Sequence, residues 1–116
     1  MKKTFLILSI FCLTTISSHA ALYKGQRVYS QVCMQCHTDG ETFVSMKVQR
    51  EWDSLMKNKG EGLSDLHLNS KKFKAQANYK KYKAYFQGSK YRKKSKHLKE
   101  FLIEYAKDSG NVPACN

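Results

Sequence analysis

Two cysteines and a histidine form the most informative cluster in this sequence. Cys33, Cys36 and His37 occur in the spacing C-x-x-C-H, which is the attachment signature of c-type haem. Two thiols three positions apart on a helical turn can each form a thioether bond to one vinyl group of the porphyrin. The histidine that follows can supply the proximal axial nitrogen to the iron. The spacing therefore predicts one covalently bound haem c, with Cys33 and Cys36 as attachment points and His37 as an iron ligand.

A C-x-x-C pair also occurs in redox disulfides and in zinc sites. A thioredoxin-like disulfide requires a strand–helix context, whereas the residues before Cys33 look helical and the chain is too short for that fold. A zinc site requires a second pair of ligands at suitable spacing. His67 and His97 are isolated from each other in the sequence, so no second pair is evident. Haem attachment is the favoured interpretation.

The first twenty residues have the layout of a secretory signal peptide. Lys2 and Lys3 precede an uncharged, mostly apolar run over residues 5–16, and small residues precede a cleavage point after Ala20. The run is too short for a membrane-spanning helix, which needs roughly twenty apolar residues. We therefore expect a signal peptide at 1–20, followed by a soluble, periplasmic domain at 21–116.

Length and composition predict one folded domain. The chain has 116 residues, of which 41% are hydrophobic, and 21 Lys+Arg against 9 Asp+Glu give a net charge of +12. These values favour a packed core over disorder. Cys12 lies in the predicted signal peptide, which leaves Cys33, Cys36 and Cys115. Because this number is odd, at least one thiol does not pair within the chain, and Cys115 is interpreted as an inert thiol or an intermolecular disulfide.

Both ends of the predicted domain resemble the small single-haem class I cytochromes c. Gly25, Val28 and Tyr29 precede the C-x-x-C-H motif in the pattern of that family's first helix. A second apolar face at helical spacing resembles the family's last helix and consists of Leu98, Phe101, Leu102, Tyr105 and Ala106. In that family, a small residue and an aromatic residue of the first helix pack across the last one. The resemblance covers residues 25–40 and 97–109.

The resemblance implies an all-α, cytochrome c-like small helical domain wrapped around one covalently bound haem. It also implies a function, which is that of a periplasmic monohaem electron-transfer protein rather than an enzyme. Two alternatives stay open: a haem-based binder or sensor of small ligands, and a haem subunit that docks on a larger periplasmic redox enzyme.

The sixth iron ligand is not fixed by the sequence. The family usually supplies a downstream methionine, and this chain has no methionine after Met56. We rank His67 first, because it lies thirty residues beyond His37 and follows a helical run. Met56, His97 and Met46 are the alternatives, in that order. Met56 fits an apolar stripe, His97 is expected to open the last helix, and Met46 leaves little chain to reach the opposite face of the haem.

The middle of the chain combines helical spacing with a strongly basic segment. Residues 49–68 predict two helical pieces around a bend at Gly60 and Gly62.

Residues 71–99 hold twelve Lys+Arg and no acid, and the aromatic residues from 79 to 86 recur at helical steps. This pattern predicts a helix with an aromatic inner face and a basic outer face. The basic 71–99 region is either a solvated face or a docking surface for acidic redox partner proteins. An anionic membrane surface is the competing partner, and export argues against nucleic acid.

Overall fold

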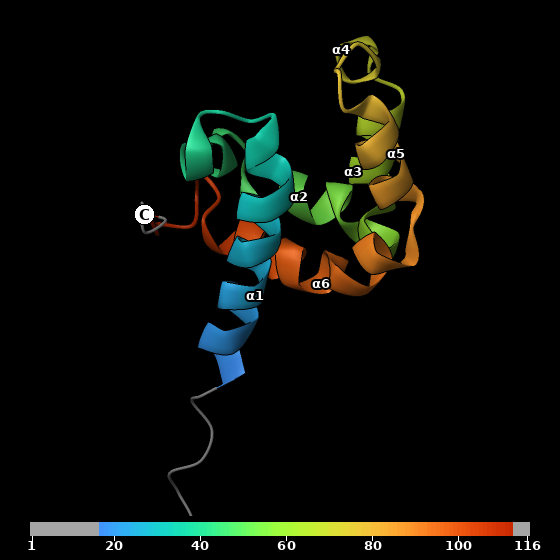
Figure 1. Ribbon diagram of the computed structural model, residues 1–116. Coiled ribbons are helices and arrows are strands. Elements are labelled where there is room, and N and C mark those ends of the chain that lie inside the picture. The colour runs from blue at the N-terminus through green and yellow to red at the C-terminus, as the bar shows by residue number, and fades with distance from the viewer. Residues whose placement is uncertain (1–16, 113–116) are drawn as a thin grey trace, which may run out of the picture.

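The computed structural model describes residues 17–112, and this part of the chain is all-helical (Figure 1). The elements are α1 (Ser17–Val32), η1 (Cys33–Gln35), η2 (Gly40–Met46), α2 (Gln49–Leu55), α3 (Lys57–Leu68), α4 (Lys71–Lys74), α5 (Tyr79–Gln87) and α6 (Ser89–Glu104). The described residues contain no strand, so the all-α prediction is confirmed for them. Most of the predicted signal peptide lies outside the described residues, as do Cys12 and Cys115.

α1 crosses α6 at close range, as the resemblance implied (Figure 1). A Cβ atom at Gly25 would lie 2.1 Å from the carbonyl oxygen of His97 and 2.6 Å from the Cβ of Phe101. Only glycine fits there, because real Cβ atoms do not approach other atoms so closely. One turn later, the rings of Tyr29 and Phe101 pack with centroids 5.4 Å apart. The Tyr29 hydroxyl also donates a hydrogen bond to the carbonyl of Gly40 at 2.8 Å, which ties α1 to η2.

The prediction that the last helix opens at His97 is wrong, because α6 begins at Ser89. Tyr91 and Ser95 are buried and continue the face of Leu98 backwards at helical spacing. The exposed lysines between them concealed this face in the sequence. α6 also ends earlier than the pattern suggested, at Glu104 rather than near residue 109.

The predicted bend between two helical pieces is confirmed, and it lies within the first residues of α3, at positions 58–60. Asn58, Lys59 and Gly60 have left-handed backbone angles, with φ of 50°, 59° and 77°. The Tyr91 hydroxyl donates a hydrogen bond to the carbonyl of Gly60 at 2.6 Å, so α6 anchors this turn. Gly62 is not part of the turn. It permits a close approach, since a Cβ there would lie 3.0 Å from the carbonyl oxygen of Leu55.

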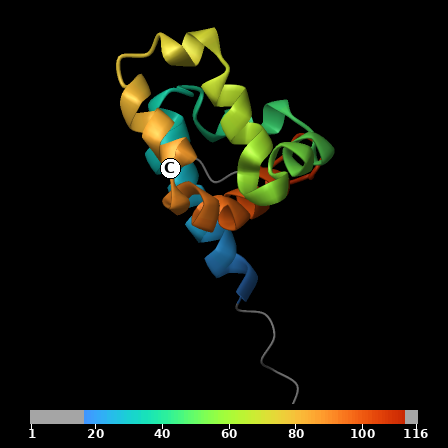
Figure 2. The same ribbon diagram turned by 90° about the vertical axis from the view of Figure 1, so that its right-hand side faces the viewer.

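α4 reverses the chain between α3 and α5 at one end of the molecule (Figure 2). The Ser70 hydroxyl accepts a hydrogen bond from the backbone N–H of Phe73 at 3.3 Å and so caps α4. In α5, Tyr82 and Phe86 are buried, whereas the lysines of the helix are exposed. The predicted helix with an aromatic inner face and a basic outer face is therefore confirmed.

Candidate functional site

The C-x-x-C-H motif forms the tight turn that follows α1. α1 ends at Val32, and residues Cys33–Gln35 continue as one 3-10 turn. The carbonyl oxygen of Cys33 accepts hydrogen bonds from the backbone N–H groups of Cys36, at 3.2 Å, and of His37, at 2.9 Å. The turn thus keeps both thiols and the imidazole on one compact loop, and both cysteines are free thiols.

The two thiols lie in different surroundings. Cys33 packs against the hydrophobic core. Burial raises the pKa of its thiol to about 12, and the neighbouring Cys36 adds a smaller increase. Cys36 itself is exposed. The motif therefore offers one attachment point that faces the interior and one that faces solvent.

Five aromatic rings gather beside this loop, and we call them the ring cluster: His37, Phe43, His67, Phe73 and Phe86. Each ring comes from a different segment of the chain. His37 stacks on Phe43, with centroids 4.0 Å apart and an angle of 22° between the planes. His67 stacks on Phe86 at 4.7 Å and meets Phe73 edge-on at 5.6 Å. The two stacks join where the rings of His37 and His67 meet at 6.1 Å and 86°.

The His67 ring is oriented by the backbone of its own helix. Its Nδ1 lies 2.8 Å from the carbonyl oxygen of Leu63, one turn earlier in α3. Because a carbonyl oxygen only accepts hydrogen bonds, Nδ1 is the donor in this contact, and Nε2 is the ring nitrogen left for another partner. Metal-bound histidines commonly use this arrangement, in which one ring nitrogen donates to the backbone and the other binds the metal.

His37 is held in its neutral form. Burial is the main cause that lowers the pKa of its imidazole, and the neighbouring His67 lowers it further. Asp39 acts in the opposite direction and raises this pKa. A neutral imidazole has a free lone pair, which binding to a metal requires.

The other three candidates for the sixth ligand lie elsewhere in the described chain. Met56 is buried in the core, where its methyl group lies beside Gly60. Met46 is 66% exposed. His97 lies at the crossing of α1 and α6, and its Nδ1 faces the carboxylate of Glu100 at 3.9 Å. Of the four candidates, His67 is therefore the one whose ring contacts that of His37.

Sequence reasoning missed the three phenylalanines of the ring cluster. Phe73 lies in α4, which is only four residues long and too short to show helical spacing. Phe43 had no signal, because it lies in η2, where no helical spacing marks an inner face. Phe86 had a signal, since it belongs to the aromatic face of α5. That pattern shows that Phe86 faces inwards, but it does not show that the ring stacks on His67.

The basic 71–99 region extends over α4, α5 and the first part of α6. Its lysines are mostly exposed. The ammonium of Lys99 forms an ion pair with the carboxylate of Asp53 at 2.8 Å, and this pair links α6 to α2. Hydrogen bonding to Lys99, together with its charge, holds the pKa of the Asp53 carboxyl below its usual range.

No family model, curated protein or solved structure matches this chain. Between residues 17 and 112, no helix is both long enough and apolar enough to cross a membrane. Over the same range, no three histidine, cysteine or acidic side chains come close enough together to hold a metal ion by themselves.

Proposed function

We propose that this chain is an exported electron-transfer protein that carries one haem c. Cys33 and Cys36 would hold the haem covalently, and His37 and His67 would bind its iron. The observation that carries the proposal is the pairing of the His37 and His67 rings, 6.1 Å apart, directly beside the C-x-x-C-H turn.

The spacing of the two imidazoles is suitable for one shared metal ion. If a nitrogen of each ring pointed at the same ion, metal–nitrogen bonds of about 2 Å would place the two ring centroids about 6 Å apart. The observed separation is 6.1 Å. A porphyrin supplies four nitrogen donors to its iron, so two side chains complete the coordination. The contact of Nδ1 with the Leu63 carbonyl also leaves Nε2 of His67 as the ring nitrogen available to a metal.

The residues around the two imidazoles support electron transfer rather than chemistry on a substrate. When bound, haem iron exchanges single electrons reversibly, and its axial ligands set the potential. Phe43 holds one face of His37, and Phe86 holds one face of His67. Rings packed in this way resist movement when the charge at the site changes. A pair of histidine ligands also gives a lower potential than a methionine–histidine pair.

The basic 71–99 region supports an acidic redox protein as the partner. The segment holds twelve positive charges and no acidic residue of its own, and only Lys99 among them forms an ion pair within residues 17–112. The remaining charges create a field that steers acidic surfaces and accelerates the first encounter. We expect the rate of electron exchange with an acidic partner to fall steeply as salt is added. A rate that does not change with ionic strength would remove the docking role of this region.

The visible spectrum of the chain, matured in a host that attaches haem c, tests the proposal. We expect a mass increase of one haem, a haemochrome typical of two thioether bonds, and low-spin iron in both redox states without the charge-transfer band of an iron–methionine bond. The variant His67→Ala should become high-spin and bind carbon monoxide rapidly, while the matched variant His97→Ala should keep the parent spectrum. Colourless protein at the mass of the bare polypeptide would refute haem attachment, and an unchanged His67→Ala spectrum would exclude His67 as a ligand.

A further inference from the structure

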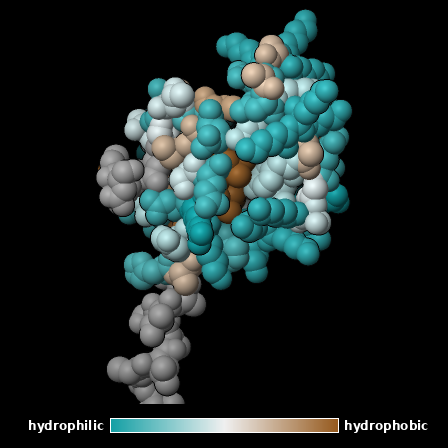
Figure 3. All heavy atoms as spheres, viewed as in Figure 1, coloured by the Kyte–Doolittle hydropathy of each residue, from teal (hydrophilic) through white to brown (hydrophobic). Residues whose placement is uncertain are grey.

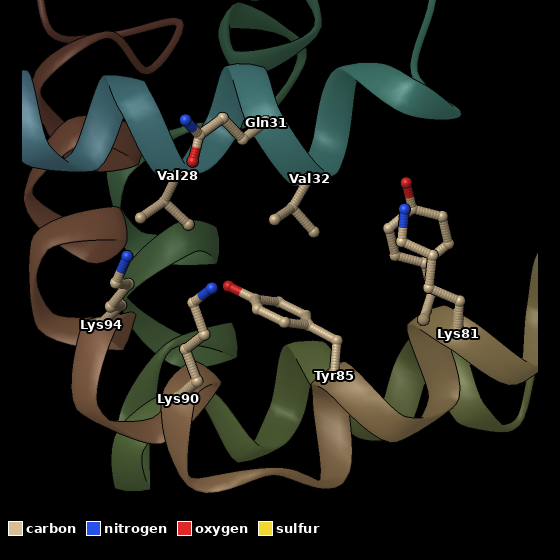
Figure 4. Close-up of a pocket in the computed structure, with 8 residues that line it drawn as sticks. Val28, Gln31, Val32, Lys81, Tyr85, Lys90 and Lys94 are labelled. Atoms are coloured by element: carbon tan, nitrogen blue, oxygen red, sulfur yellow. The ribbon is translucent and has the colours of Figure 1, made fainter.

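A cavity of about 200 Å³ lies between α1, α5 and the start of α6. Val28 and Val32 of α1 form one wall, and Tyr85 of α5 faces them across the gap (Figure 4). The space-filling view shows an apolar floor in a hollow beside α1, framed by hydrophilic side chains (Figure 3). The cavity thus has an apolar interior and a polar rim.

Three lysines supply the charge at this rim. Lys81 comes from α5, and Lys90 and Lys94 come from α6. All three are exposed, and no acidic residue lines the cavity. Within residues 17–112, lysine forms an ion pair at Lys99, with Asp53, and none of the three rim lysines takes part in it. The ammonium of Lys81 lies over the ring of Tyr82, 5.4 Å from its centroid, so Lys90 and Lys94 supply the charge most available to an anion that enters the cavity.

The Tyr85 hydroxyl adds a hydrogen-bond donor at the same rim. Figure 4 shows this hydroxyl and the ammonium of Lys90 pointing towards each other. Burial raises the pKa of Tyr85 to about 12, so the phenol keeps its proton at neutral pH. An anion at the rim thus meets a neutral O–H donor as well as ammonium groups.

We propose that this cavity binds a small organic carboxylate with a compact apolar body. The apolar body would lie against Val28 and Val32, and the carboxylate would lie between Lys90 and Lys94. An apolar cavity of about 150 Å³ is known to hold benzene, so 200 Å³ accommodates one aromatic ring together with a carboxylate. Inorganic phosphate would satisfy the lysines but leave the valine wall without a contact. The site adjoins the proposed haem attachment, since Val32 precedes Cys33 and Cys33 lies close enough to raise the pKa of Tyr85, so binding is measured on protein of known haem content.

Calorimetric titration of the full chain, as purified after export, tests the site with three probes. Benzoate carries the ring and the charge, benzyl alcohol carries the ring alone, and phosphate carries the charge alone. We expect saturable one-to-one binding of benzoate, at least about tenfold tighter than that of the other two probes and weaker as salt is added. Absence of saturable benzoate binding, or equal affinity for benzoate and benzyl alcohol, would overturn the proposal.

Charge-neutral variants locate the binding. Lys90→Gln/Lys94→Gln should weaken benzoate binding about tenfold. The matched control Lys72→Gln/Lys74→Gln removes the same charge from α4, outside the cavity, and should change the affinity less than about twofold. If both double variants lost the same affinity for benzoate, the binding would reflect attraction to the overall positive charge of the protein, and this would contradict a defined site in the cavity. Val32→Phe fills the cavity and should abolish benzoate binding. Absorbance of each sample reports haem attachment separately, so failure of one proposal is not mistaken for failure of the other.

Discussion

The crossing of α1 with α6 and the ring cluster are both closely packed, but they are built from different contacts. At the crossing, backbone meets backbone, because Gly25 lies directly against the carbonyl of His97. In the ring cluster, long side chains meet through faces and edges, at centroid separations from 4.0 Å to 6.1 Å. The crossing therefore has no room for added atoms, whereas the ring cluster can accept another ring of similar shape. The imidazoles can be changed chemically without a large loss of packing.

The largest effect is expected at the crossing. Gly25→Val places new carbon atoms where the carbonyl oxygen of His97 and the Cβ of Phe101 already lie. Because one neighbour is backbone, the helices must separate, and we expect a loss of about 3 kcal/mol in the free energy of unfolding. Denaturant unfolding followed by circular dichroism measures this loss. Ser30→Ala, an exposed change in the same helix, is the control and should stay within about 0.5 kcal/mol. Equal stability of the two variants would contradict the close approach.

A medium effect is expected where α6 holds the left-handed turn at the start of α3. Tyr91→Phe removes the hydroxyl that donates to the carbonyl of Gly60 and leaves this buried oxygen without its donor. We expect a loss of about 1–2 kcal/mol in the free energy of unfolding. The control is Tyr23→Phe, which removes a hydroxyl from an exposed ring of α1. If the two variants lost the same amount of stability, the hydrogen bond would not support the turn.

A smaller effect on stability, with a large effect on the proposed function, is expected in the ring cluster. His67→Phe keeps a flat ring against Phe86 and Phe73 and loses one hydrogen bond to the carbonyl of Leu63. We expect the free energy of unfolding of the haem-free chain to change by less than about 1 kcal/mol. In haem-loaded protein, the same variant should lose the low-spin spectrum. If His67→Phe lost as much stability as Gly25→Val, the main role of the His67 side chain would be packing rather than iron binding.

The sequence predicted the helical faces well, because each face is a local pattern. The aromatic spacing in α5 indicated its inner face, whereas the crossing at Gly25 and Tyr29 was expected only from the resemblance to class I cytochromes c. The start of α6 was missed, since exposed lysines between Tyr91 and Leu98 obscured one continuous apolar stripe.

The site was less predictable, because its parts come together only through tertiary structure. His67 was ranked first from its distance along the chain, and the structure does pair its ring with that of His37. The stacking partners were not predictable, since they depend on how η2 folds back and on the chain reversal at α4. The cavity between α1, α5 and α6 was missed for the same reason. Three helices form it, and no single segment carries its pattern.

The smallest effect expected is a pH dependence that arises in the ring cluster and not at the crossing. In the haem-free chain, burial and His67 hold the pKa of His37 below its ordinary value of 6.5. As the pH falls through 6.5, the unfolded chain therefore binds a proton at this position before the folded chain does. The contribution of His37 to stability is complete above that pH and is lost towards the lowered pKa. The free energy of unfolding, measured over about one pH unit to each side of 6.5, should show this decline.

Two variants separate this decline from other titrations. His37→Gln removes the titrating group and should reduce the decline. Asp39→Asn should extend it to lower pH, because the Asp39 carboxylate raises the pKa of His37 and so opposes the shift. The extension should be modest, since Asp39 is exposed and solvent screens its charge. If the decline were the same in all three proteins, it would come from other groups, and the buried neutral imidazole would not be the pH-sensitive element of the ring cluster.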